Sequence, residues 1–194
     1  MHRWLVILLT PLLAHAAVEQ EIAPAAANQF RLTVAKTGLF SGKKHLFDFE
    51  TYQGVIRFEK DDPAKSSVRI EVNSKSFVLR DEWVSEKDRR KITEFTHKEM
   101  LETERYPAIR FVSSKAEAAG EQIKVTGDLT IRNITKPVVV WVRQRESSAD
   151  GMLFEGQARF RMTDFGLKPP TAALGAIGTR DEVELSFVLK TRFR

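Results

Sequence analysis

The sequence predicts an all-β fold in which about eight or nine strands form an antiparallel barrel with one helical interruption. First, apolar and polar residues alternate in short segments along most of the chain, as in strands with one apolar face. Second, turn-prone residues separate these segments. Third, only residues 85–104 have helical character. Because the apolar face lies consistently on one side, closure into a barrel would remove exposed sheet edges.

Residues 1–16 are predicted to be a cleavable secretory signal peptide, which places the mature chain in the periplasm or outside the cell. They comprise a short basic start, an apolar core at residues 4–13 and an A-x-A cleavage pattern at residues 14–16. A transmembrane anchor is the alternative, but the apolar run is shorter than the roughly 18–20 residues that span a bilayer. No cysteine follows the cleavage pattern, which argues against a lipoprotein anchor.

Composition and charge narrow the class of protein. The rest of the 194-residue chain is enough for one domain, predicted at residues 28–194 after a small-residue linker at residues 17–27. The formal net charge is +5, but Lys and Arg are interspersed with Asp and Glu, so a nucleic-acid partner is not expected. The absence of cysteine excludes disulfides and thiolate metal sites. The 13 phenylalanines predict a large aromatic core.

Four strands are predicted before the helical segment. Apolar residues share one face in each of them, namely Phe30, Leu32 and Val34, then Phe47 and Phe49, then Ile56 and Phe58, and finally Val68, Ile70 and Val72. The two glycines of residues 38–45 mark a turn, and Asp61-Asp62-Pro63 is expected to close a hairpin.

Residues 106–142 organise the chain, because they predict three consecutive strands at residues 109–113, 123–131 and 138–142. The first two alternate in the usual way. Residues 138–142 are instead apolar on both faces, which predicts that the sheet is covered on its outer side there, or that this strand lies near an edge.

The helical segment contains two capping-box patterns, which begin at Ser85 and Thr96. They predict one helix at residues 86–95 and a shorter one at residues 97–103. The apolar side of the first helix is expected to dock on the sheet. Pro107 prevents the helix from continuing and begins the return to strand.

A long connection, residues 163–180, lies between two further alternating strands at residues 152–162 and 183–189. It is too apolar for a loop that only faces water, and loops of this length are usually functional or disordered. The sequence therefore predicts that it plugs the barrel end or controls ligand entry. Leu174 and Ile177 are the side chains expected to cover the lumen.

Candidate catalytic and metal-binding residues are few. Beyond residue 16 the histidines are His45 and His97, and neither has partners at metal-site spacing. We expect His97 to be solvated and His45 to lie at the barrel mouth in a structural hydrogen bond. Asp81 and Asp88 are explained by helix capping and by ion pairs with neighbouring arginines. No catalytic motif is present, so no enzymatic activity is predicted.

Several motifs resemble the YceI-like family of lipid-binding proteins. They are RYPAIRF at residues 105–111, VTGDLTIRNITKPV at residues 125–138, and TDFGLKP followed by DEVELSF in the last third. The resemblance covers nearly the whole mature chain. Asn133 stands where family members often have Gly, and Asn tolerates the same left-handed turn. The segment before Pro107 looks like one subgroup of the family.

The resemblance implies an extended, eight-stranded, lipocalin-like β-barrel that encloses an isoprenoid lipid, such as a quinone tail or a polyprenyl chain, for transport or storage. It also implies a periplasmic or secreted location. An enzyme acting on an apolar substrate inside the barrel is the alternative. The expected ligand is this lipid, without a further cofactor or metal. Transient contact with a membrane surface and homodimerisation are the other interactions considered.

The candidate ligand-binding residues are those expected to line the lumen or its mouth. They are Phe40, His45, Phe49, Ile70, Phe77, Phe111, Leu129, Ile131, Phe154, Phe160, Phe165, Leu174 and Ile177. For any single phenylalanine, ordinary core packing is the simpler explanation. Together they suit a long apolar ligand, because such a site needs an apolar lumen.

Overall fold

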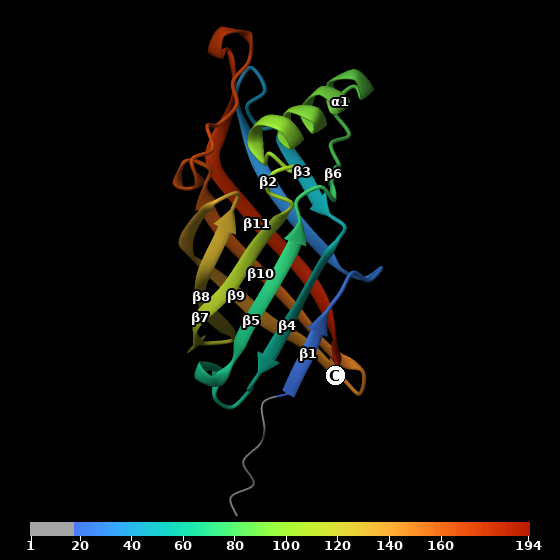
Figure 1. Ribbon diagram of the computed structural model, residues 1–194, viewed down its shortest axis with the longest axis vertical. Helices are drawn as coiled ribbons and strands as arrows, with labels where there is room; N and C mark the ends of the chain where they lie inside the picture. The colour runs from blue at the N-terminus through green and yellow to red at the C-terminus, as the bar shows by residue number, and fades with distance from the viewer. Residues whose placement is uncertain (1–17) are drawn as a thin grey trace, which may run out of the picture.

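The computed structural model describes residues 18–194, so the predicted signal peptide at residues 1–16 lies outside the described residues. An antiparallel sheet of eleven strands curls into an elongated barrel (Figure 1). We call the end where the helix α1 lies the upper end, and the end where the C terminus lies the lower end. The prediction of an all-β, antiparallel barrel with one helical insertion is confirmed.

Eight strands close the barrel, because β1 pairs with β4 on one side and with β11 on the other. In order around the ring they are β1 (Val18–Ile22), β4 (Tyr52–Phe58), β5 (Ser67–Asn73), β7 (Ala108–Ala119), β8 (Gln122–Ile131), β9 (Ile134–Ser148), β10 (Gly151–Arg161) and β11 (Ile177–Phe193). A short helix, η1 (Pro63–Lys65), lies between β4 and β5.

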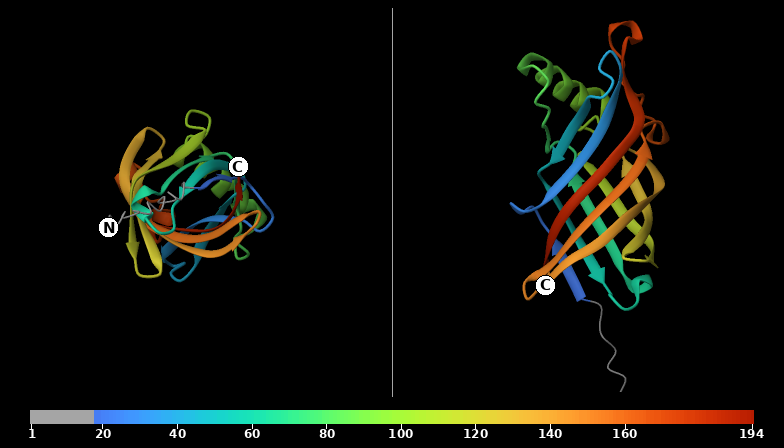
Figure 2. Two further views of the ribbon diagram at one scale, coloured as in Figure 1. Left: turned by 90° about the horizontal axis from the view of Figure 1, so that it is seen from below. Right: turned by 180° about the vertical axis from the view of Figure 1, so that it is seen from behind.

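Three more strands extend the barrel upward from β11. They are β2 (Gln29–Gly38), β3 (Lys44–Phe49) and β6 (Phe77–Leu79), in the sheet order β11-β2-β3-β6. One edge of β11 pairs with β2 between residues 177 and 188 and with β1 only at residues 191–193. The ring is therefore closed at the lower end, while the upper half is walled on one side by this three-stranded extension (Figure 2).

The predicted linker at residues 17–27 was wrong, since it contains β1. Gln20 faces the interior and is fully buried, with its carboxamide oxygen accepting a hydrogen bond from the hydroxyl of Thr191 on β11. Met152 Sδ also accepts from Gln20 Nε2 at 3.3 Å. Because Gln20 is polar and faces inward, β1 lacks the alternation of apolar and polar residues that predicts a strand. This polar contact joins the first and last strands of the ring.

The helical insertion lies across the upper end of the barrel (Figure 1). Helix α1 (Glu86–Phe95) has the predicted bounds, and the Ser85 hydroxyl accepts from the Asp88 N–H at 3.1 Å, as the capping pattern requires. The second, shorter helix predicted at residues 97–103 is present only in part and is not separate from the first. Thr96 is not an N-cap, because its own N–H already bonds to carbonyls of α1, and the chain continues directly into the π-helix η2 (Thr96–Met100).

Strand β9 corrects the expectation for residues 138–142. Val138 and Val140 face inward and are each 7% exposed, whereas Trp141 faces outward and is 37% exposed. The strand is central, with β8 and β10 as its neighbours. An apolar outer face here therefore reflects neither a covering layer nor an edge position.

The two connections at the upper end also differ from expectation. In the β8–β9 turn the left-handed residue is Arg132 (φ 58°) rather than Asn133, and its guanidinium pairs with Glu102 and lies over the Tyr106 ring at 5.7 Å. The predicted loop at residues 163–180 is shorter, because β11 begins at Ile177. The remainder contains two short helices, η3 (Thr163–Phe165) and η4 (Ala173–Gly175).

Candidate ligand-binding cavity

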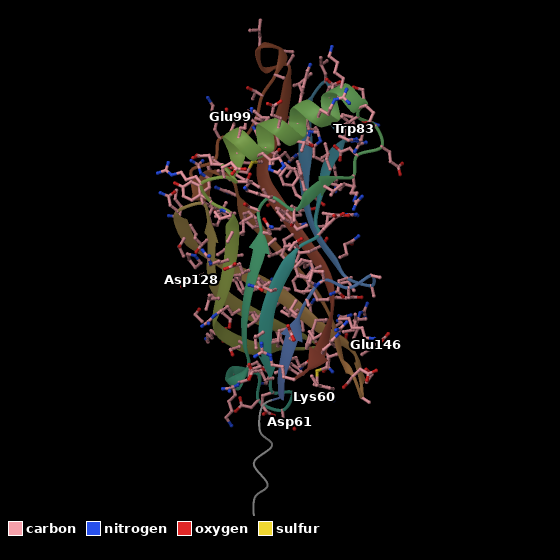
Figure 3. All side chains as sticks on the ribbon, turned by 45° about the vertical axis from the view of Figure 1, so that its right-hand side comes forward. Lys60, Asp61, Trp83, Glu99, Asp128 and Glu146 are labelled. Carbon is pink, nitrogen blue, oxygen red and sulfur yellow. The ribbon has the colours of Figure 1, made fainter. Side chains whose placement is uncertain are left out.

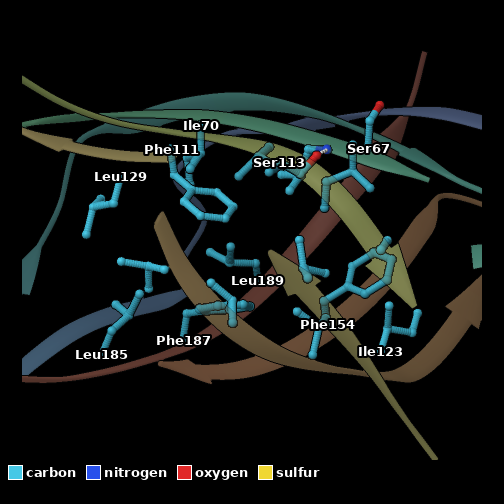
Figure 4. Close-up of a pocket in the computed structure, with 18 of the residues that line it drawn as sticks. Ser67, Ile70, Phe111, Ser113, Ile123, Leu129, Phe154, Leu185, Phe187 and Leu189 are labelled. Carbon is cyan, nitrogen blue, oxygen red and sulfur yellow. Dashed lines mark hydrogen bonds between the residues drawn. The ribbon is translucent and has the colours of Figure 1, made fainter. Parts of the chain in front are cut away.

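The lower half of the barrel encloses an apolar cavity of about 130 Å³, which we call the lower chamber. Inward-facing side chains of the ring strands line it, among them Ile70, Phe111, Leu129, Phe154 and Phe187 (Figure 4). The hydroxyl-bearing residues in its wall are Ser66, Ser67 and Ser113. A cavity with so few polar groups favours hydrocarbon over water.

Two glycines shape this chamber by letting aromatic rings lie flat on the sheet. A Cβ on Gly156 would come 2.2 Å from the ring of Phe187, and one on Gly127 would come 2.5 Å from the ring of Phe111. The Phe187 ring also stacks on Phe30 at 6.3 Å. Small residues on β8 and β10 therefore keep these rings against the wall, so that they do not fill the lumen.

The upper half holds a larger cavity of about 640 Å³, the upper chamber, which lies beneath α1. The inner faces of β2 and β3, the segment from Trp83 to Leu101 and the β10–β11 connection contribute to its wall. Polar groups occur here as well as apolar ones, including Lys36, His45, Asp88 and Thr179. The upper chamber can therefore recognise a polar group as well as hold an apolar one.

The two chambers meet at Ile109 and Phe160, which line both. The Phe160 ring is fixed by an edge-on contact with Phe165 at 5.5 Å. The two chambers are therefore adjacent along the barrel, with these apolar side chains between them.

His45 and Asp81 form a buried pair at the wall of the upper chamber. They are 8% and 2% exposed, and Asp81 accepts from the Leu46 N–H at 2.8 Å with one oxygen and bonds to His45 Nδ1 with the other. Because Asp81 occupies Nδ1, Nε2 is the imidazole nitrogen that, among the described residues, is left to contact a ligand. Trp83 stacks on the imidazole at 5.3 Å.

The expected ion pair between Asp81 and its neighbour Arg80 was wrong. Arg80 faces outward and pairs with Glu50 at 2.7 Å and Asp48 at 3.4 Å, whereas Asp81 points inward. Arg89 of α1 instead donates to the backbone carbonyl of Asp81. The structural hydrogen bond predicted for His45 is present.

Lys36 brings a positive charge to the upper chamber. Its Nζ donates to Thr179 Oγ1 at 3.1 Å, and within residues 18–194 no carboxylate lies within 4.0 Å of it. Burial lowers the pKa of Lys36, and the charge of Asp81 opposes that shift. A half-buried ammonium group with only a hydroxyl as partner is suited to a ligand atom that accepts hydrogen bonds.

His97 is not the solvated residue that the sequence suggested. Its ring lies 4.4 Å from that of Phe77, and its Nδ1 is 3.1 Å from Thr103 Oγ1. Burial, followed by the charge of Lys75, lowers the pKa of His97. The residue therefore ties η2 to β6 on the outside of the upper chamber.

The structure distributes the predicted site residues between the two chambers. Ile70, Phe111, Leu129 and Phe154 line the lower one, Phe40, His45, Phe49, Phe77, Ile131 and Ile177 line the upper one, and Phe160 lines both. Phe165 is buried behind Phe160 and lines neither. Leu174 was wrongly expected to cover the lumen, since it is fully exposed at the tip of its loop. Ligand contact by the other residues stays a prediction.

Lys36, Trp83 and Ile109 were not among the predicted site residues. Lys36 has the same strand phase as Phe30, Leu32 and Val34, so the alternation of β2 alone could have placed it inside. Trp83 had no such signal, because it precedes α1 in an irregular segment.

Within the described part of the chain, no three His, Cys, Asp or Glu side chains gather as a metal site would require. Residues 18–194 contain no helix that is both long enough and apolar enough to cross a membrane.

Comparison with protein families gives a match to the YceI-like domain over residues 21–191. A UPF0312 protein of Pseudomonas savastanoi pv. phaseolicola is 29% identical over 132 residues, which cover 63% of each chain. Protein YceI of Escherichia coli O157:H7 is 27% identical over 125 residues, which cover 62% of each. The chain thus spans somewhat less than two thirds of the length of these curated relatives.

Solved structures show the same fold. BcnA of Burkholderia cenocepacia aligns with a TM-score of 0.65 and 21% identity, covering 83% of this chain and 95% of BcnA. The YCEI protein of Campylobacter jejuni aligns with a TM-score of 0.60 and 17% identity, covering 76% of this chain and 84% of that protein. At these identities the likeness concerns the fold alone.

Proposed function

We propose that this chain, which belongs to the YceI-like domain family, holds one isoprenoid-type lipid inside its barrel for transport or storage. The family is a barrel fold that generally binds apolar ligands. The observation that carries the finer proposal is the divided lumen, in which an apolar lower chamber continues into a wider upper chamber with a few polar groups. A quinone or a polyprenyl chain has the same two parts, a long apolar tail and a small polar head.

The tail would occupy the lower chamber. The eight-strand ring closes around its lower end, and its wall consists mainly of aliphatic side chains and phenylalanines. Each methylene group moved from water into such a site contributes about 0.8 kcal/mol. The affinity should therefore rise with the length of the lipid tail that passes Ile109 and Phe160 into the lower chamber.

The head would lie in the upper chamber beside Lys36 and His45. Lys36 supplies a donor, and the Nε2 of His45 is the ring nitrogen that the Asp81 carboxylate leaves free. A quinone carbonyl or a phosphate oxygen accepts a hydrogen bond from the Lys36 ammonium group, and the free imidazole nitrogen can contact the same head group. The aromatic rings of Phe40 and Trp83, 5.6 Å apart, would cover this head on its outer side.

An enzyme acting on an apolar substrate is the second candidate, and the His45–Asp81 pair is the observation that favours it, since such pairs serve in acid–base catalysis. In the described residues, however, no serine, threonine or lysine side chain is hydrogen-bonded to the imidazole. A nucleophile held by the base is the usual companion of such a pair. The geometry therefore supports binding better than turnover.

Organic extraction of the purified protein, followed by mass spectrometry, tests the proposal. We expect an unmodified isoprenoid lipid at close to one molecule per chain. Phe111→Asp should lose this lipid, because an unpaired carboxylate in an apolar cavity is costly. Val112→Asp is the matched control, since the neighbouring side chain points outward and is 41% exposed.

Two results would contradict the proposal. One is a wild-type protein that is folded but empty and takes up neither added quinone nor added polyprenol. The other is chemical conversion of the added lipid that depends on His45, which would favour the enzyme. The proposed periplasmic or secreted location rests on residues 1–16 and is tested by N-terminal sequencing of the exported protein, which should begin at residue 17.

A further inference from the structure

We propose that the upper end of the barrel docks on anionic lipid bilayers, so that the bound lipid exchanges directly between the upper chamber and the membrane. The docking surface is formed by the β2–β3 turn, residues 39–43, and the β10–β11 connection, residues 166–176, and we call it the docking tip. The exchange of lipid rests on the proposed lipid-carrying function, whereas the membrane-docking surface does not depend on it.

Two fully solvent-facing leucines lie at the docking tip. Leu39 is 78% exposed and Leu174 is 110% exposed, whereas the partly exposed Phe40 joins them at 40%. The two segments are neighbours, because the Leu39 N–H donates to the Ala176 carbonyl at 3.0 Å and Gly38 pairs with Ile177. Figures 1 and 2 show both segments projecting at the upper end of the molecule.

The backbone around Leu174 is held in an unfavourable conformation. Ala173 and Leu174 have φ angles of 49° and 56°, in the left-handed region that residues with a Cβ rarely adopt. Such strain is concentrated at functional sites. Here its result is that a large apolar side chain projects into solvent, which an environment less polar than water would favour.

The charged residues in the two sequence segments that carry these leucines are all basic. Residues 37–44 and 166–180 contain Lys43, Lys44, Lys168 and Arg180 but no Asp or Glu. Within the described residues only Lys44 of these four has a carboxylate within 4.0 Å, that of Glu184 at 3.9 Å. An apolar tip surrounded by cations matches the interfacial region of a bilayer that contains anionic lipids.

The turns at the lower end of the barrel carry more acidic than basic residues, namely Glu59, Asp61, Asp62, Glu121 and Asp150 against Lys60 and Lys65. Figure 3 labels Lys60, Asp61 and Glu146 in this half, with Trp83 and Glu99 at the other end. An anionic surface would therefore attract the docking tip more than these turns.

The docking tip is continuous with the opening of the upper chamber. Phe40 lines the chamber from the β2–β3 turn, and Pro170 and Ala172 line it from the β10–β11 connection. A lipid that leaves the chamber at this point enters the bilayer without crossing water. The same residues therefore serve both the membrane contact and the exit of the ligand.

Co-sedimentation with vesicles tests the docking. The full exported chain should bind vesicles that contain phosphatidylglycerol and not vesicles of phosphatidylcholine alone, and salt should weaken the binding. Leu39→Asn together with Leu174→Asn should reduce binding by roughly tenfold or more, since two apolar side chains no longer insert. Asn suits the left-handed backbone at residue 174, and Val112→Asn on the barrel flank is the matched control.

Transfer kinetics then separate docking from cargo binding. The double variant should carry as much extracted lipid as the wild type but deliver it more slowly to anionic vesicles. Equal affinity for neutral and anionic vesicles, or no effect of the two substitutions, would overturn the proposal. So would a dimer in light scattering that the double variant dissociates, because the leucines would then contact a second copy. Vesicle binding by a protein without lipid would leave docking intact and contradict the proposed function instead.

Discussion

The two halves of the lumen differ in how they are built. A closed ring of eight paired strands surrounds the lower end of the lower chamber, and the contact between Gln20 and Thr191 joins its first and last strands. The upper chamber has nearly five times the volume of the lower one, about 640 Å³ against about 130 Å³, and α1 forms part of its cover. No residue of α1 is fully buried. The difference supports a division of the proposed function, with retention of the lipid in the lower chamber and its exchange at the upper one.

The polar groups follow the same division. Lys36, His45 and Asp81 all belong to the upper half, where the proposed head group would stay near the opening. The lower half offers contacts that depend on apolar area and therefore on chain length. Substitutions in one half should accordingly change a different property from substitutions in the other.

The largest effect is expected at the junction of the chambers. Phe160→Asp should lower the free energy of unfolding by about 3–5 kcal/mol, because it leaves an unpaired carboxylate in an apolar interior and removes the contact with Phe165. It should also empty both chambers. Urea denaturation and lipid extraction measure the two effects. Phe160→Leu is the control, and a Phe160→Asp protein that melts and binds like the wild type would show that the chambers are not connected here.

Removal of Asp81 should affect the upper half. Asp81→Ala leaves His45 Nδ1 and the Leu46 N–H without their hydrogen-bond partner, and unpaired buried groups of this kind cost about 3 kcal/mol together. We expect the head group to be held less specifically while tail-length preference is unchanged. Competition between lipids that differ only in the head, and then only in the tail, measures this. Loss of tail-length preference would contradict the division of roles.

How far the sequence could lead is clearest from particular residues. Strand alternation placed Phe111 and Leu129 on the inner face, because a two-residue period needs no tertiary information. The His45–Asp81 contact could not be found in this way, since the residues are 36 positions apart and meet only through the pairing of β3 with β6. Leu174 was misplaced because the direction of its side chain depends on a left-handed backbone conformation, and a Leu in the sequence does not indicate that conformation.

A third prediction concerns the shape of the lower chamber. Gly156→Ala should displace the ring of Phe187 from the sheet into the lumen, because the new Cβ would otherwise lie 2.2 Å from it. Overpacking of this kind costs about 1–3 kcal/mol. Longer tails should be excluded before shorter ones, as a titration with a series of chain lengths would show. Unchanged preference across the series would mean that the tail does not reach Phe187.

The smallest effect is a pH dependence confined to the upper half. Burial lowers the pKa of His97 below its ordinary value near 6.5, so the unfolded chain takes up this proton at a higher pH than the folded one. The contribution of neutral His97 is therefore fully present above about pH 6.5 and is lost as the pH falls through the folded-state pKa. Protonation of His97 should weaken its contact with Phe77 on β6 and thereby loosen η2 in that pH range. Amide hydrogen exchange should report faster opening of α1 and η2 on acidification, with β8 and β9 unaffected. His97→Gln keeps a hydrogen-bonding side chain for Thr103 but does not titrate, so the variant should lack this component. If wild type and variant respond alike between pH 7.5 and pH 5, His97 does not couple acidification to the upper chamber.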